Sequence, residues 1–263
     1  MSIMNTIKDK FKFLRKFIFE TSVIIIGISI SFWLNNTQAK AENLRKEIQL
    51  LKAVQLNINE IEVYVLDREK KLTAENELMD YLSVNWNAIN YDSVTQVLLS
   101  GGNTKSFHNL FLDYREFHPP ISEITSIIED GSLALMSNNE IKLKIISLLD
   151  NNLEFLNQNV SSEIALQQEF RIALLQSDNQ EIKTILKTSQ GELRERFYIE
   201  DDFTEKTRSE LVAINKLNSG ENYLSLKIRQ RFFVMYYLGE FKTKLKELKD
   251  EVDLELSLRT ENT

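Results

Sequence analysis

The clearest pattern of hydrophobic and polar positions is an apolar stretch near the N-terminus. Residues 17–34 read FIFETSVIIIGISISFWL, and residues 22–34 are apolar or small on every side of a helix. Its 18 residues would extend about 27 Å as a helix, close to the roughly 30 Å hydrocarbon thickness of a bilayer. Aromatic residues stand at both ends, as membrane interfaces favour. The pattern predicts a transmembrane helix over 17–34, because a buried core helix would be amphipathic.

Basic residues predict the orientation of this segment. Five of them precede it and three lie in the 16 residues after it, namely Lys8, Lys10, Lys12, Arg15 and Lys16 before, and Lys40, Arg45 and Lys46 after. Cytoplasmic flanks carry the excess of Lys and Arg. We therefore expect a cytoplasmic tail over 1–16 and a periplasmic domain over 35–263, anchored in a bacterial inner membrane.

A cleaved signal peptide is the main alternative. Ala39-Lys40-Ala41 fits an A-x-A cleavage pattern, so cleavage after Ala41 stays open. The apolar region is longer than the usual 7–15 residues, and a helical pattern begins at once beyond it. Both features favour an uncleaved anchor.

The next segment, from Asn35 to about Asn85, is predicted to form one long helix. The sequence allows this helix to continue directly from the membrane helix. One heptad position is apolar throughout: Leu44, Leu51, Ile58, Val65, Leu72 and Met79. The other is poor, because Ile48 is followed by Gln55, Glu62 and Glu69. A strict two-stranded zipper needs both positions. This helix is thus expected to pack in a bundle, with Val54 and Ile61 widening its apolar face.

Capping patterns predict the remaining helices. Ser93–Gln96 and Ser137–Glu140 are capping boxes, the second opening a long helix to about Gln176. Pro119 and Pro120 predict a loop and then a short helix over 121–130, which Gly131 ends. Two shorter helices are expected within 178–218, separated by a polar loop near 191–202.

The last predicted helix runs from a Ser219 cap to about Leu256. Its seam alternates spacings of three and four and is typical of a coiled coil: Leu238, Phe241, Leu245, Leu248 and Val252. The aromatic block 232–237 is too short to span a membrane and is expected in the core. The chain has only 7 Gly and 2 Pro in 263 residues, and this scarcity of turn residues favours long helices. The predicted fold class is therefore all-α, with one transmembrane helix followed by an extracytoplasmic bundle of long, partly coiled-coil-like helices.

Composition narrows the function classes. The net charge of −7 gives no support to a nucleic-acid partner. The absence of cysteine excludes disulfides, cysteine metal sites and a lipoprotein anchor, but suits either the cytosol or the periplasm.

Catalytic motifs are scarce. The two histidines, His108 and His118, form an H-x4-D-x2-E-x-H cluster with Asp113 and Glu116, and these are zinc-type ligands. The spacing matches no established metal site, and a solvated loop also collects polar residues. We predict no catalytic residue, no metal and no cofactor, and hence no enzyme.

The membrane segment contains the candidate functional residues Glu20, Gly27, Asn35 and Asn36. Glu20 is an ionisable group in an apolar helix, which suggests contact with a partner's charge or proton transfer. The sequence favours a simpler interpretation, an i, i+4 pair with Lys16 near the cytoplasmic interface. Gly27 and Ser31 form a small-xxx-small pair that lets a second helix approach.

These residues also resemble an uncharacterised family of inner-membrane proteins from Gram-negative bacteria. Its motif E-x6-G-I-x-I-x4-N-N corresponds to Glu20, residues 27–30, Asn35 and Asn36. A second shared motif runs through Ile124, Ile127, Gly131, Leu133, Leu135, Ser137-Asn138 and 141–145, although members usually have Tyr at Ile124 and Trp at Thr37. The resemblance implies the anchor and the helical domain but no activity, and it strengthens the interest in Glu20.

Three functions follow as hypotheses. The leading one is a membrane-anchored interaction or scaffold protein of the cell envelope, whose partners are the bilayer and a second protein or a homo-oligomer, bound through the membrane helix and the helical seams. The second is a sensory or ligand-binding domain that relays through a membrane partner, because a 16-residue tail is too short for a signalling domain. The third is an envelope enzyme with a metal site at His108–His118.

Overall fold

The fold is all-helical, as predicted. The computed structural model describes residues 3–90, 92–94, 110–112, 114–178, 180, 182–183 and 211–260, with side chains from Phe19 onward. No strand occurs in these ranges. The helices are α1 (Ile3–Asn85), η1 (Trp86–Ala88), α4 (Ser122–Glu129), η2 (Ser132–Leu135), α5 (Asn139–Ser147), η3 (Leu148–Leu153), α6 (Glu154–Leu175) and α10 (Asn218–Thr260).

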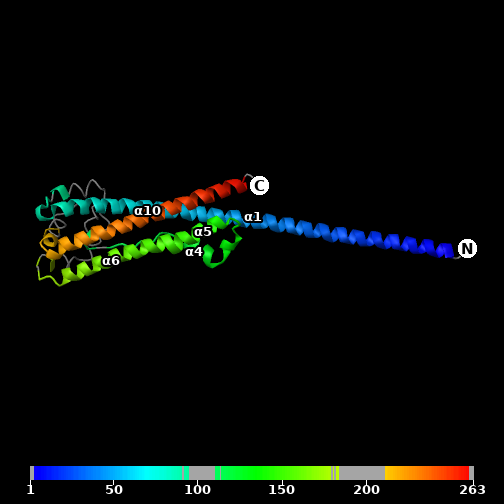
Figure 1. Cartoon of the computed structure of the whole chain (residues 1–263), viewed down its shortest axis with the longest axis horizontal. Helices are drawn as coiled ribbons and strands as arrows, with labels where there is room; N and C mark the ends of the chain where they lie inside the picture. Colours follow the sequence, from blue (N-terminus) through cyan, green and yellow to red (C-terminus); the bar gives the residue numbers. More distant parts are fainter. Residues whose placement is uncertain are drawn as a thin grey trace, which may run out of the picture.

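Three long rods form the bundle. They are the second half of α1, the run α5–η3–α6, and α10, which packs against both of the others (Figure 1). The first half of α1 extends alone beyond the bundle to the N-terminus, while the C-terminus lies part-way along α1 (Figure 1). The 83 residues of α1 contain no proline and a single glycine, Gly27, so nothing in the sequence interrupts the helix. The expected continuity of residues 17–34 with the following helix is confirmed.

A bilayer-spanning helix is not found in the part of the chain that the structure describes, because no helix there is long and apolar enough.

The predicted apolar seams are confirmed as core. On α1, Leu44 is half-buried and the next five members of its seam are buried, as are all five seam residues of α10. The buried side chains separate into two clusters. One contains Leu51 to Leu72 of α1 and Val234 to Leu256 of α10. The other contains Leu78 to Trp86 of α1 and Tyr223 and Leu224 of α10.

The poor seam of α1 is a polar interface with α10. Glu62 pairs with Lys249 at 2.5 Å and Glu69 with Lys242 at 2.6 Å. Gln55 donates to the Asp253 carboxylate at 2.6 Å. As the residue numbers increase along α1, the numbers of their partners on α10 decrease, so the two helices are antiparallel. These polar positions therefore match the charge of a specific neighbour.

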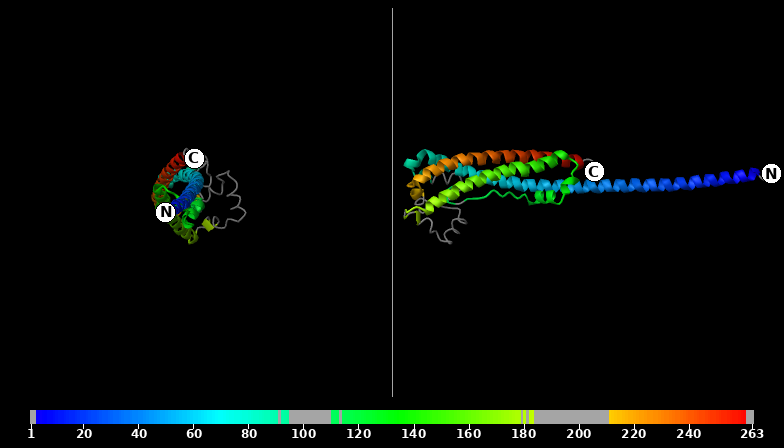
Figure 2. Two further views of the ribbon diagram at one scale, coloured as in Figure 1. Left: turned by 90° about the vertical axis from the view of Figure 1, so that its right-hand side faces the viewer. Right: turned by 60° about the horizontal axis from the view of Figure 1, so that its bottom comes forward.

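An extended segment, 114–120, runs along α1 before α4 begins (Figure 2, right). Arg68 Nη2 donates to the Arg115 carbonyl at 2.6 Å, and the Tyr64 hydroxyl accepts the His118 N–H at 2.9 Å. Asn57 then donates to the Pro120 carbonyl at 2.7 Å. The expected loop at the two prolines and the helix over 121–130 are both confirmed, and Gly131 ends that helix with a φ of 78°.

Three predicted helix starts are wrong by a few residues. The cap of α5 is Asn138 and not Ser137, because the Asn138 Oδ1 accepts the Glu140 and Ile141 N–H groups at 2.9 and 3.3 Å. Asn90 and not Ser93 caps residues 92–94, accepting the N–H groups of Asp92 and Ser93. Helix α10 begins at Asn218, one residue before Ser219, and ends at Thr260. The described residues do not include Gln96 or the predicted loop 191–202. They also leave out most of the two shorter helices predicted within 178–218.

The long helix after residue 138 is not regular. A π-helical segment, η3, separates α5 from α6. Leu148 and Leu153 are both buried, five residues apart, whereas the sequence predicted one long helix without such an interruption. A wider turn accommodates one extra residue and keeps later apolar positions on the bundle side.

The aromatic block 232–237 is wrongly predicted as core. Phe232, Phe233 and Tyr236 are 67%, 40% and 54% exposed. Six consecutive helical residues cover the whole circumference, but α10 buries only the sides that face α1 and α6. Val234 is the one buried residue of the block.

Replacing Asn138 with Ala is expected to destabilise the protein by at least about 1 kcal/mol, because α5 loses its side-chain cap and Glu255 loses the hydrogen bond from the Asn138 amide. Chemical unfolding followed by far-UV circular dichroism measures this change. Asn139→Ala is the matched control, since Asn139 is exposed and is the first residue of α5. An equal loss for both variants would contradict the assignment of the cap.

Candidate functional site

A charged layer separates the two apolar clusters. It contains Glu75 of α1, Glu163 and Gln167 of α6, and Lys227 and Arg231 of α10, all less than 9% exposed. Along each helix these residues fall between the end of one apolar cluster and the start of the other. We call these five residues the polar layer.

Arg231 is the centre of the polar layer. Its Nη2 lies 2.8 Å from Glu75 Oε2 and 2.5 Å from Glu163 Oε1, and its Nε lies 3.0 Å from Glu163 Oε2. One guanidinium from α10 therefore binds carboxylates of both α1 and α6. The planar fork of arginine suits such a double contact better than an ammonium group does.

Lys227 completes the layer one turn away on α10. Its Nζ lies 2.7 Å from Glu163 Oε1 and 2.7 Å from the Gln167 amide oxygen. Burial alone would raise the pKa of Glu163, but the adjacent Arg231 and Lys227 lower it to about 2. The same burial lowers the pKa of Lys227, and the two glutamates raise that of Arg231 against the effect of burial. Glu163 is thus held ionised.

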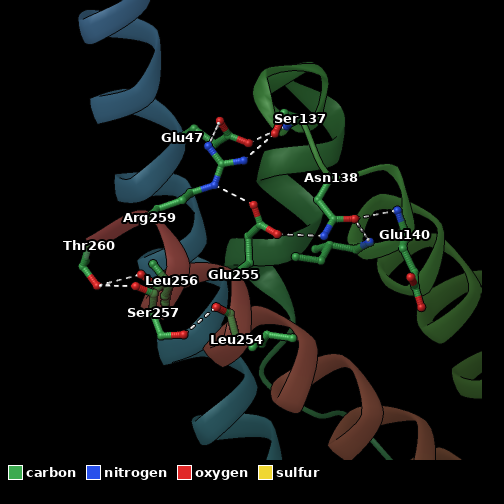
Figure 3. Close-up of polar contacts among 11 residues, drawn as sticks. Glu47, Ser137, Asn138, Glu140, Leu254, Glu255, Leu256, Ser257, Arg259 and Thr260 are labelled. Carbon is green, nitrogen blue, oxygen red and sulfur yellow. Dashed lines mark hydrogen bonds and ion pairs between the residues drawn. The ribbon is translucent and has the colours of Figure 1, made fainter. Parts of the chain in front are cut away.

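A second polar group, which we call the Arg259 clamp, lies where α1 leaves the bundle (Figure 3). It consists of Glu47, Ser137, Asn138, Glu255 and Arg259. Arg259 lies between two carboxylates, with Nη1 2.7 Å from Glu47 Oε2 and Nε 2.6 Å from Glu255 Oε1. Its Nη2 also donates to the Ser137 hydroxyl.

The clamp links three segments of the chain. Glu47 of α1 accepts the Ser137 N–H at 2.5 Å, and Glu255 of α10 accepts from the Asn138 amide at 2.9 Å. The hydrogen bonds from Asn138 and Arg259 lower the pKa of Glu255. Glu47 is 6% exposed, so α1 is fixed to the bundle at the level where its lone N-terminal half begins.

The sequence-predicted candidates lie outside both groups. Glu20, Gly27, Asn35 and Asn36 are all exposed on the lone half of α1, and Glu20 has an interaction partner. Gly27 has open space around it, and Ser31 donates to its carbonyl at 2.9 Å. A helix turns about 100° per residue, so Glu20, Gly27 and Ser31 share one face while Asn36 lies opposite.

The proposed metal cluster has only two described members. The Glu116 Oε2 and His118 Nε2 atoms lie 2.5 Å apart, and both side chains are exposed. His108 and Asp113 fall outside the described residues. Within the described ranges, no group of three or more metal-binding side chains occurs.

Sequence inspection missed the polar layer, and one signal could have revealed it. Lys227 and Arg231 occur at i, i+4 in the apolar phase of α10, and Glu163 and Gln167 do the same on α6. Charged residues at core positions require partners. Matching such pairs between helices would have indicated a buried ion network, although not its geometry.

No protein family, no curated protein and no solved structure matches this chain.

Replacing Glu163 with Gln is expected to destabilise the fold by about 3 kcal/mol, because Arg231 and Lys227 then remain buried with one carboxylate fewer. Urea unfolding measures the change. Asp67→Asn is the matched control: it breaks the exposed Asp67–Lys71 pair and should stay within about 0.5 kcal/mol of wild type. A loss at Glu163 as small as the control's would show that the layer adds nothing.

Acid should unfold the wild type partly through the same residue. The folded pKa of Glu163, about 2, is below its ordinary 4.5. Its ionisation therefore contributes full stability above pH 4.5, and that contribution falls as the pH drops toward 2. Unfolding free energies measured across this range should fall less steeply in Glu163→Gln. Parallel curves for the two proteins would contradict the depressed pKa.

Proposed function

We propose that this protein is a single-pass, membrane-anchored interaction or scaffold protein of the bacterial cell envelope. In this proposal, residues 17–34 cross the inner membrane, residues 1–16 stay in the cytoplasm, and the bundle stands in the periplasm. The bundle supplies a binding platform and no catalysis. The proposal is also consistent with the resemblance to the uncharacterised inner-membrane family.

The observation that supports it most is the exposure of the lone half of α1. Ten large apolar side chains between Phe19 and Leu34 are 49–72% exposed. Consecutive members such as residues 23–26 point in all directions, so no single protein groove would cover them. Transferring ten half-exposed side chains from water to an apolar environment is favourable by on the order of 10 kcal/mol. Lipid surrounds a helix on every side, and the two apolar residues 17–18 would extend the segment.

The flanking charges support the orientation. The basic residues before position 17 outnumber those after position 34, as the positive-inside rule requires. About 20 Å of α1 separates Leu34 from the Arg259 clamp at Glu47. The bundle would thus stand clear of the membrane surface on a helical stalk, residues 35–46.

One face of the anchor suits a helix of a partner or of a second copy. Gly27 and Ser31 let two backbones approach closely, and Glu20 lies on the same side about two turns away. An ionisable group near such a contact can pair with a residue of the partner. This face is where we expect a protein partner in the membrane.

A relay is the second candidate function, and the continuity of α1 favours it. The same helix passes through the proposed membrane segment, the stalk, the clamp and the polar layer. Movement of the bundle would therefore displace or rotate the membrane segment directly. An enzyme has weaker support, because the described part of the His108–His118 cluster is an exposed pair.

Photocrosslinking in cells tests the proposal with two matched positions. A crosslinking residue replaces Ser31, on the Gly27 face, or Ser29, about 160° away on the other side of the helix. Full-length protein should remain in the membrane after carbonate washing in both cases. We expect a discrete crosslinked protein from position 31 and mainly lipid from position 29.

Release by carbonate would contradict the anchor itself. Equal products from both positions would contradict the partner face while leaving the anchor intact. A crosslinked band of twice the chain mass identifies a second copy, and any other mass identifies a different protein for sequencing by mass spectrometry.

A further inference from the structure

A small cavity adjoins the polar layer. It measures about 20 Å³, and α1, α6, α10 and the extended segment 114–120 all contribute to its wall. A water molecule needs roughly 10–15 Å³ on this measure. The cavity therefore has room for one particle of the size of a water molecule or a monatomic ion.

The wall of this cavity is positively charged. Among its described residues, four are basic and two are acidic: Arg68, Arg115, Lys227 and Arg231 against Glu75 and Glu163. Both acids already bind Arg231, and Glu163 also binds Lys227. Arg68 has its side chain hydrogen-bonded to a neutral carbonyl, that of Arg115. Positive charge is thus in excess among the residues that line this cavity.

Two donors at this cavity have no acceptor. Arg68 Nε and Arg231 Nη1 are buried, and neither donates a hydrogen bond to any described residue. Leaving a buried donor of a charged group unpaired is costly. Burial and the charge of Arg231 lower the pKa of Arg68, while Glu75 and Glu163 act in the opposite direction. An acceptor with negative charge would remove both deficits.

We propose that this cavity is a binding site for one small inorganic anion of the size of chloride, held between Arg68 and Arg231. The anion accepts the two free N–H groups and reduces the excess positive charge. It would thereby join helix α1 to helix α10. The site does not depend on the membrane anchor proposed above.

Thermal unfolding of the full-length protein in mild detergent tests the site. Sodium chloride is exchanged for sodium gluconate at constant ionic strength, because gluconate is too large for the cavity. Chloride should raise the Tm by about 2–4 °C, with the rise following the logarithm of its concentration. Arg68→Gln should abolish this dependence, because it removes both the charge and the Nε donor.

Arg45→Gln is the matched control, since Arg45 is an exposed arginine on the same helix, and it should respond to chloride like the wild type. A wild-type Tm that does not change between the two salts would overturn the proposal, as would a chloride response that persists in Arg68→Gln. If Arg68→Gln fails to fold, crystals of the wild type grown in sodium bromide decide. Anomalous density between Arg68 and Arg231 would support the site, and water alone there would overturn it.

Discussion

The double contact of Arg231 determines how the three rods fit together. Its guanidinium must reach Glu75 on α1 and Glu163 on α6 at the same time. Sliding α10 by one turn, about 5.4 Å, would move these charges into an apolar cluster without partners. The apolar seams on both sides tolerate several registers, because Leu, Ile and Val can repack. A buried ion pair adds little net stability over an apolar pair, so its main effect here is to select one alignment.

The surface between α1 and α10 repeats this selection with weaker contacts. Acidic side chains on α1 face basic side chains on α10 at Glu62–Lys249 and Glu69–Lys242. Each such half-exposed pair contributes less than about 1 kcal/mol, but a parallel arrangement would lose them together. The Arg259 clamp adds the loop before α5 to the same pair of helices. Direction, register and closure of the bundle thus depend on charged residues, while the apolar residues provide most of the stability.

Sequence periodicity was sufficient for much of this fold and insufficient for the site. The seams through Ile58 and Phe241 were predicted because a repeat of three and four residues depends only on local helix geometry. The π-helical turn at η3 was not predictable, because its packing against α10 is not visible in the local sequence. Asn138 was passed over for Ser137 since both are good caps and only the surrounding contacts decide between them. The polar layer escaped notice because its pairs join residues far apart in the chain, such as Glu75 and Arg231.

Because the stalk, residues 35–46, is one unbroken helix, the number of residues in it determines how the bundle is oriented. Each residue between the proposed anchor and the clamp advances the helix by about 1.5 Å and turns it by about 100°. The direction in which the bundle faces, relative to the Gly27 side of the proposed anchor, therefore depends on the number of residues between them. Substitutions within 35–46 leave that direction unchanged, whereas the loss or gain of one residue would swing the whole bundle by more than a quarter turn. The length of this stretch, and not the chemistry of its side chains, therefore sets the direction in which the bundle faces.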